Sequence, residues 1–158
     1  MALKVLTNVI VFQSPEILYN KLRDLAAASK TSISRVVRAL LWDRYDRHSH
    51  HPVKLHDELT LLLSNTSPLE ESMGKPEKLI PEPIVVRATE HMVDWLQDTA
   101  KLVQAPLSRL VRSLLWEAQA YNEADGRLEP YLKTLDSRDA TVALNIGEST
   151  ERWWQNDE

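Results

Sequence analysis

The stretch Ser34-Arg35-Val36-Val37-Arg38-Ala39-Leu40-Leu41-Trp42 returns 74 positions later as Ser108-Arg109-Leu110-Val111-Arg112-Ser113-Leu114-Leu115-Trp116. Seven of the nine positions are identical. The same offset aligns residues further upstream, so the two copies cover roughly residues 7–45 and 81–119. Internal repetition indicates a unit that cannot bury its apolar face alone and packs against its second copy. We therefore predict two related units that act as a fused homodimer.

Each unit begins with the alternation of an extended strand. Val9 and Val11 fall on one face and Ile10 and Phe12 on the other, and residues 83–87 of the second copy alternate in the same way. A helix start follows in both copies. Ser14-Pro15-Glu16 offers a cap hydroxyl, a proline for the first helical position and an acidic first turn, and Thr89-Glu90 is a simpler version.

Two helices are predicted after each strand, separated by polar breaks at 29–32 and 104–106. The spacing of apolar residues places a buried stripe on each helix. The stripes of the first helices are Leu18, Leu22, Leu25 and Ala26, and Met92, Leu96 and Ala100. Those of the second helices are Ile33, Val36, Val37, Leu40 and Leu41, and Leu107, Leu110, Val111, Leu114 and Leu115. Arg35, Arg38, Arg109 and Arg112 are predicted to be solvated or locally paired, and Trp42 and Trp116 to pack in or near the core.

This order, with the segments SPEILYNKLRDLAAASKTSISRVVRALL (14–41) and TEHMVDWLQDTAKLVQAPLSRLVRSLL (89–115), resembles the ribbon-helix-helix family (MetJ/Arc/CopG-like) of small prokaryotic DNA-binding proteins. The resemblance covers about half of the chain. It implies a mainly α fold with a short β ribbon, in which two strands pair and four helices interlock. Both copies come from one chain here, so the expected arrangement is an intramolecular pseudo-dimer with a C-terminal extension.

The resemblance also implies base-reading residues on the outward ribbon face. These are Val9, Val11 and Gln13 from the first strand and Val85 and Arg87 from the second, with Pro83 at that strand's start. Arg87 is expected to bind guanine and Gln13 adenine, while the valines contact thymine methyl groups. The face carries few hydrogen-bonding groups for this family. The alternative is a ribbon used only for strand pairing or for docking a protein.

Phosphate binding is implied where the second helix begins, because the backbone N–H groups and the helix dipole favour an anion there. The matching residues are Lys30, Thr31, Ser32, Ile33 and Ser34 in the first copy, and Leu107 and Ser108 in the second. Pro106 replaces Ser32 and has no N–H, so the second site is predicted to be weaker. The family's frequent glycine at the turn is Lys30 or Gln104 here. A plain helix cap is the alternative reading of Ser32 and Ser34.

Composition narrows the function. The 158 residues include no cysteine and only three glycines, and show no phosphate loop, nucleophile elbow or paired acidic motif, so we expect no enzyme and no cofactor. His48, His50, His51 and His56 cluster without the other residues of a metal motif, and no metal is predicted. No apolar run approaches the roughly 20 residues that cross a bilayer, so we expect a cytoplasmic protein.

Charge and composition divide the chain into four segments. Residues 1–48, the first repeat, hold 8 Lys and Arg against 4 Asp and Glu, whereas the second repeat, 81–121, holds 4 against 5. Between them, 49–80 is a connector with a possible short helix at 54–63 and a proline-rich tether over 64–83. The C-terminal extension, 122–158, holds 4 Lys and Arg against 9 Asp and Glu. It is expected to contain a helical turn at Pro130–Leu135 and an edge strand at Thr141–Ile146. The Trp153-Trp154 pair among its acidic residues is typical of a protein-binding segment or of a self-capping strand.

The sequence thus favours a DNA-binding transcriptional repressor whose partner is double-stranded DNA, with side-by-side self-association on DNA as a further expectation. Tandem relatives also serve as accessory proteins at plasmid transfer origins. The alternative from another class is an antitoxin-like or adaptor protein that binds a protein partner through residues 122–158.

Overall fold

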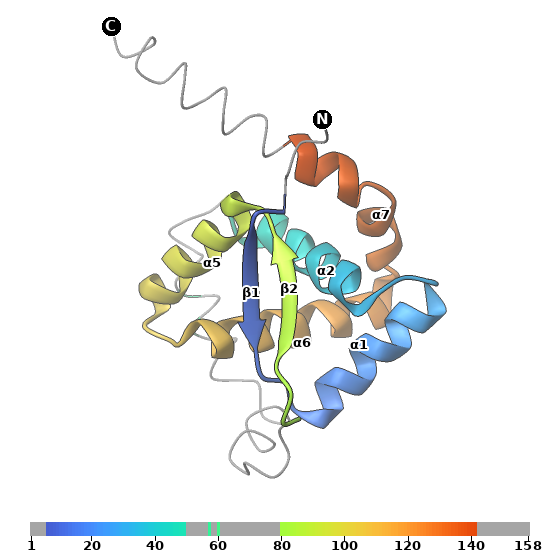
Figure 1. The fold of residues 1–158 in the computed structure, drawn as a ribbon, viewed down its shortest axis with the longest axis horizontal. Helices are drawn as coiled ribbons and strands as arrows, with labels where there is room; N and C mark the ends of the chain where they lie inside the picture. Colours follow the sequence, from blue (N-terminus) through green and yellow to red (C-terminus); the bar gives the residue numbers. More distant parts are fainter. Residues whose placement is uncertain (1–5, 50–56, 58–59, 61–79, 142–158) are drawn as a thin grey trace, which may run out of the picture.

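The computed structural model describes residues 6–49, 57, 60 and 80–141 (Figure 1). The protein is mainly helical with a small two-stranded antiparallel sheet, as predicted. The elements are β1 (Asn8–Phe12), α1 (Glu16–Ala28), α2 (Ile33–His48), β2 (Ile84–Ala88), α5 (Glu90–Val103), α6 (Leu107–Asp125) and α7 (Leu128–Lys133). Residues 135–141 are also helical. The order strand, helix, helix therefore occurs twice, and α6 continues past the expected boundary at residue 121.

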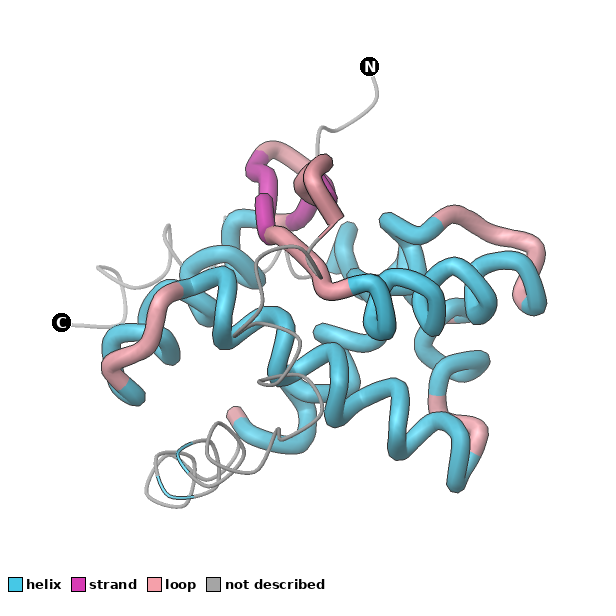
Figure 2. Tube along the Cα trace, turned by 90° about the horizontal axis from the view of Figure 1, so that it is seen from below, coloured by secondary structure: helices cyan, strands magenta, loops and turns pink. Residues whose placement is uncertain are grey.

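The ribbon formed by β1 and β2 lies at one edge of the helical body (Figure 2). Its inward side chains are apolar because alternate residues of a strand point to opposite faces. Ile10, Phe12 and Val86 are buried, and Ile84 is partly buried against the same core. The register places Val11 directly opposite Val85. These two residues are 74 positions apart, which is the offset of the sequence repeat, so equivalent residues of the two copies pair with each other at this point.

The turns between the paired helices have the same conformation in both copies. Lys30 and Gln104 take left-handed φ angles of 55° and 56°. After α1, the N–H of Thr31 donates to the carbonyl of Ala26. The corresponding bond after α5 runs from Ala105 to Ala100. This is the Schellman pattern that ends many helices, formed here without the usual glycine.

The helix starts agree with the sequence in part. Thr89 caps α5 by accepting a hydrogen bond from the N–H of Met92, and Ser32 caps α2 in the same way through Arg35. The prediction that the Ser14 hydroxyl caps the first helix is wrong. Ser14 is buried and donates to the Pro15 carbonyl, while Pro15 is itself the N-cap of α1. The fixed φ of proline supports that extended cap position.

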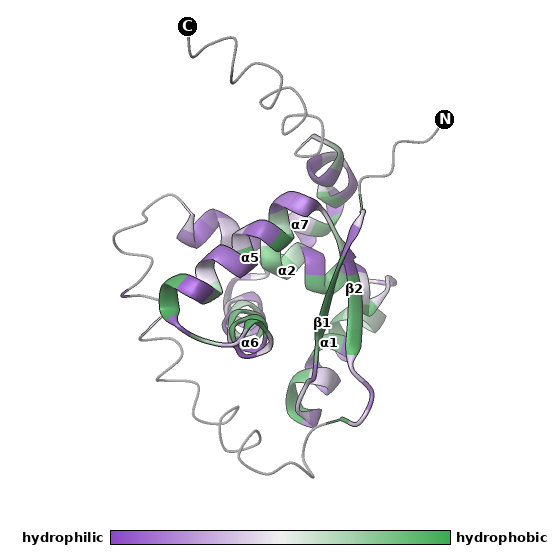
Figure 3. Ribbon diagram, turned by 60° about the vertical axis from the view of Figure 1, so that its left-hand side comes forward, coloured by the Kyte–Doolittle hydropathy of each residue, from purple (hydrophilic) through white to green (hydrophobic). Residues whose placement is uncertain are grey.

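The core lies between the ribbon and the helices, with α2 and α6 packed against each other at its centre. The predicted apolar stripes are largely buried, and their members Leu25, Ile33 and Leu107 are partly buried at the border of the core. Trp42 is fully buried and Trp116 partly so, in accord with their predicted packing role. Figure 3 shows the green of apolar residues gathered on β1, β2 and α6. The buried side chains of the second helices are Val36, Val37, Leu40, Leu41, Leu110, Val111, Leu114 and Leu115.

The C-terminal segment, residues 128–141, packs against α2 (Figure 1). The predicted helical turn at Pro130–Leu135 is confirmed by α7. Thr141 is helical rather than the start of an edge strand, and residues 142–146 lie outside the described part. Alternation over a few residues does not distinguish a strand from a helix whose apolar face meets a neighbour.

Several other expectations fall on residues that the structure does not describe. Of the possible helix at 54–63, only Asp57 and Thr60 are described, and both are helical. Most of the tether over 64–83 lies outside the described residues, as do His50, His51, His56 and Trp153-Trp154. At the tether's described end, the N–H of Ile80 donates to the carbonyl of Ser14. No helix within the described ranges is long and apolar enough to span a bilayer.

Candidate nucleic-acid interface

The outward face of the ribbon is exposed and largely aliphatic. Val9, Val11 and Val85 keep 53%, 48% and 57% of their surface accessible. An antiparallel sheet with one face on the core normally carries polar residues on the other. Here the valines occupy those polar positions, so the outward face of the ribbon is an exposed apolar surface.

The two polar candidates on this face lie at opposite ends of the ribbon. Arg87 is exposed within β2 and lies opposite Val9. Gln13 and Pro83 are also exposed, but they lie just outside β1 and β2. Gln13 and Arg87 are equivalent in the repeat, yet they are not cross-strand neighbours. The ribbon therefore offers a cation near one end and an amide near the other.

The start of α2 collects the phosphate-binding candidates of the first copy. Lys30 and Ser32 are exposed, and Thr31, Ile33 and Ser34 are partly buried. The Ser32 hydroxyl is engaged as the helix cap, 3.2 Å from the backbone nitrogen of Arg35. The first-turn N–H groups of a helix lack intrahelical acceptors, so Ile33 and Ser34 remain the backbone donors best placed for an anion.

The start of α6 differs, because an arginine connects it to the ribbon. Arg112 donates to the Ser108 hydroxyl at 2.8 Å and to the backbone carbonyl of Gln13 at 3.2 Å. Burial and the neighbouring charge of Arg109 lower the pKa of Arg112. Two arginines thus approach each other beside Leu107 and Ser108. Such a pair gives this helix start a positive potential that favours an anion.

The equivalent arginines of α2 make ion pairs with the C-terminal segment. Arg35 donates to Asp136 at 2.7 Å, and Arg38 donates to Asp139 at 3.2 Å. Arg38 is only 7% exposed, so the prediction of a solvated or locally paired surface arginine is wrong for this residue. Its partner is 101 residues away. The acidic segment therefore neutralises part of the basic excess of the first repeat.

Further contacts hold the C-terminal segment on α2. The buried Asp139 also accepts from the indole nitrogen of Trp42 at 2.9 Å. Arg138 binds Asp46 and stacks 4.5 Å from the centre of the Trp42 ring. Burial and a hydrogen bond to Asp46 raise the pKa of Tyr131 to about 12. These contacts indicate a fixed structural element rather than a free tail over residues 128–141.

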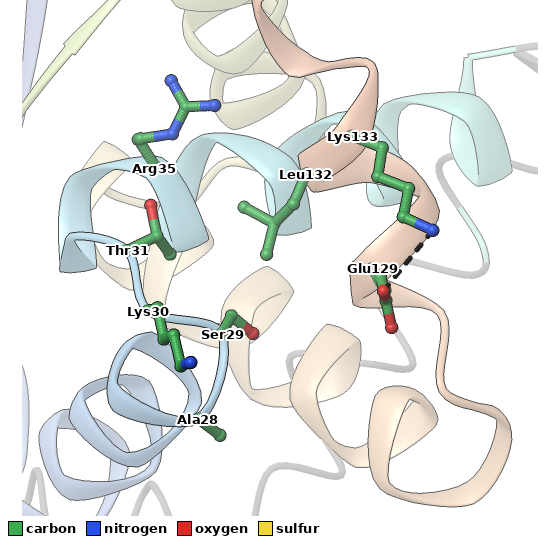
Figure 4. A pocket seen from close by; sticks show the side chains of 8 residues that line it. All are labelled: Ala28, Ser29, Lys30, Thr31, Arg35, Glu129, Leu132 and Lys133. Atoms are coloured by element: carbon green, nitrogen blue, oxygen red, sulfur yellow. Dashed lines mark ion pairs between the residues drawn. The ribbon is translucent and has the colours of Figure 1, made fainter.

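A cleft of about 520 Å³ lies between the α1–α2 turn and α7 (Figure 4). Lys30, Thr31 and Arg35 line one side of the cleft. Lys133 and Glu129 line the other and form an ion pair of 3.5 Å. The cleft thus borders the phosphate-binding candidates, but its lining mixes both charges.

Sequence reasoning missed a buried ionic cluster between α2 and α6. Arg44 is 1% exposed and donates to Asp43 and to Glu117, which occupy equivalent positions of the repeat. His48 lies 3.1 Å from the same Glu117 carboxylate, and Arg127 donates to Asp43 at 2.9 Å. The acidic residue directly after each repeated tryptophan was the available signal. Among the described residues, no three His, Asp or Glu side chains are placed to hold a metal ion.

No family model matches the sequence, and neither a curated protein nor a solved structure matches it.

Proposed function

We propose that the chain is a sequence-specific DNA-binding protein, acting as a transcriptional repressor, in which two ribbon-helix-helix units form an intramolecular pseudo-dimer. The observation that carries the proposal is the exposed ribbon face bordered by two helix starts. In Figure 1 the α1–α2 turn lies to one side of the ribbon and the α5–α6 turn to the other. A two-stranded ribbon fits the major groove, and helix N-termini beside it suit the flanking phosphates.

The charges near the ribbon support this arrangement. Arg87 projects from β2 on the exposed face, and Arg109 and Arg112 lie at the start of α6. Lys30 is exposed beside the start of α2. The acidic excess behind the net charge of −4 is concentrated in residues 122–158, whereas the exposed ribbon face carries the cation Arg87. Arginine binds the O6 and N7 atoms of guanine, so Arg87 is the main polar base reader in the proposal.

Selection of bound sequences from a random pool of duplexes tests the proposal. We expect the wild-type chain to enrich a site whose two halves differ, because Gln13 and Arg87 read different bases. Replacing Arg87 with Ala should weaken specific binding by roughly 1–3 kcal/mol and relax the preference at one base pair on one side. Replacing Gln13 with Ala should act on the other side.

The exposed Arg23 on α1 provides a control, and Arg23→Ala should leave the selected site unchanged. Failure to enrich any sequence would contradict the proposal. If neither Arg87→Ala nor Gln13→Ala alters the selected site, the ribbon does not recognise bases, and a protein partner becomes the favoured alternative.

A further inference from the structure

Three valines form one continuous patch at the centre of the exposed ribbon face. Val11 and Val85 lie directly opposite each other, and Val9 follows on the same face of β1. Residues opposite each other in an antiparallel pair are about 4.5–5.5 Å apart, and alternate residues of a strand are about 7 Å apart. We call Val9, Val11 and Val85 the valine patch. Its length matches about two base-pair steps, because each step rises 3.4 Å.

The chemistry of the valine patch limits what it can recognise. Valine has no side-chain donor or acceptor, so it cannot bond to the edge of a guanine or a cytosine. Covering those polar edges with valine would leave their donors and acceptors without partners, which is unfavourable. Thymine differs because it presents a C5-methyl group in the major groove. Contact between that methyl group and valine removes apolar surface from water on both sides.

We propose that the valine patch recognises pyrimidine C5-methyl groups at the centre of the binding site, an inference that rests on the proposed function. Charge complementarity favours duplex DNA as the occupant over an apolar protein surface. Arg87 lies opposite Val9, and Arg112 donates to the carbonyl of Gln13, the residue that follows β1. A cationic border around an apolar centre fits a groove with a methyl-lined floor and phosphate walls.

The register also gives the position of the methyl groups. Val11 and Val85 are equivalent residues of antiparallel strands, so they approach equivalent positions on the two DNA strands. The centre of the site therefore carries methylated pyrimidines on both strands. Val9 continues the apolar surface toward Arg87, so a guanine is expected beyond the methyl groups on that side only.

Two bases carry this methyl group, thymine and 5-methylcytosine, and binding titrations distinguish them. The probes are duplexes of the selected site with its central thymines replaced by uracil, or by cytosine and 5-methylcytosine. Uracil lacks only the methyl group, and each loss should weaken binding about fourfold, as expected for roughly 0.8 kcal/mol per buried methylene-sized group. Tighter binding of 5-methylcytosine than cytosine would extend the recognition to that base. Equal binding of the 5-methylcytosine and cytosine duplexes would limit methyl recognition to thymine.

Protein variants show whether the valines cause the effect. In Val85→Ala and Val11→Ala, the ratio of thymine to uracil affinities should fall toward one. Val85→Thr keeps the β-branched shape and should retain part of that ratio. The control Leu102→Ala removes an exposed apolar side chain from α5 and should leave the ratio unchanged.

The proposal is overturned if neither methylated base binds more tightly than its unmethylated counterpart, or if the valine variants weaken both duplexes equally. The uracil comparison needs only the wild-type chain, so it holds even if a variant fails to fold. A selected site that binds thymine and uracil duplexes alike would refute methyl recognition and leave the proposed function intact. Failure to select any site would refute both.

Discussion

Val11 of β1 lies directly opposite Val85 of β2, the residue that takes its place in the second repeat. Equivalent residues of the two copies therefore pair with each other at this point of the ribbon. In the ribbon-helix-helix family the sequence resembles, two separate chains supply the paired strands. Here one chain supplies both, and the association needs no second molecule.

Unfolding is accordingly expected to be independent of protein concentration. Folding coupled to dimerisation makes the thermal midpoint rise with concentration, whereas a single-chain unit lacks that dependence. Midpoints measured over a hundredfold range of concentration should coincide. A midpoint that rises steadily with concentration would show that the ribbon forms between chains.

Glycine at the two left-handed positions should stabilise the fold. Lys30 and Gln104 have φ angles of 55° and 56°, a conformation that costs a side-chain-bearing residue roughly 1–2 kcal/mol. Glycine avoids this cost but loses more chain entropy, so Gln104→Gly should gain up to about 1 kcal/mol. Urea unfolding measures the change. Lys101→Gly, within α5, is the control and should destabilise by about 1 kcal/mol.

Lys30 and Gln104 should differ in DNA binding despite their shared backbone. Lys30 brings a cation to the start of α2, whereas Gln104 is neutral. On the proposed function, Lys30→Ala should weaken binding to all sequences alike and reduce the dependence of log K on log salt by about 0.9. Gln104→Ala should have little effect. Titrations at several salt concentrations test this, and equal effects of the two variants would argue against an asymmetric phosphate contact.

Asp139 should be essential for docking the C-terminal segment. Its carboxylate accepts from two buried donors, Arg38 and Trp42, and removing one partner of a buried pair costs about 3–5 kcal/mol. Asp139→Ala should therefore destabilise the protein strongly. The control Asp136→Ala removes an exposed carboxylate from the same segment and should cost at most about 1 kcal/mol. Equal losses in urea unfolding would contradict the buried role of Asp139.

Glu117 should contribute a pH dependence to stability. Burial opposes its ionisation, but hydrogen bonds from His48 and Arg44 outweigh burial and hold the pKa of Glu117 below its ordinary value of 4.5. A carboxyl group with a lowered folded-state pKa adds stability above the unfolded pKa, and this stability is lost as pH falls through the folded value. The unfolding free energy should therefore decline from about pH 4.5 downwards.

In Glu117→Gln this acid decline should be shallower, and the protein should be less stable at pH 7. Glu123→Gln, an exposed residue of the same helix, is the matched control. Urea unfolding between pH 3 and pH 7 measures both. An identical acid decline in wild type and Glu117→Gln would assign the dependence to other groups.

The helices and strands could be predicted because burial of one face and capping of a helix both depend on residues that are close together in the sequence. The alternation around Ile10 and Phe12 identified the inward face of β1, and Ser32 marked the start of α2. The left-handed turns had no such local signal in the sequence. Lys30 and Gln104 stand where glycine is usual, and their left-handed conformation accompanies the backbone hydrogen bonds that close each turn onto Ala26 and Ala100.

Long-range polar partners were not predictable in the same way. Asp139 lies in the acidic extension, for which the sequence predicted local elements and a protein partner, yet it binds Arg38 from 101 residues away. No periodicity connects such residues, because the contact depends on how the last helices fold back onto α2. For the same reason, the exposed candidates on the ribbon were easier to identify than the buried ionic cluster around Arg44.

Because one gene encodes β1 and β2 separately, the two strands of the ribbon can evolve independently. In a dimer of identical chains each mutation appears in both strands of the ribbon, so one strand cannot change without the other. Here a mutation at Arg87 leaves Gln13 untouched, and one at Lys30 leaves Gln104 untouched. On the proposed function, selection can thus act on each half of the ribbon alone, so the two halves of the bound DNA site need not match.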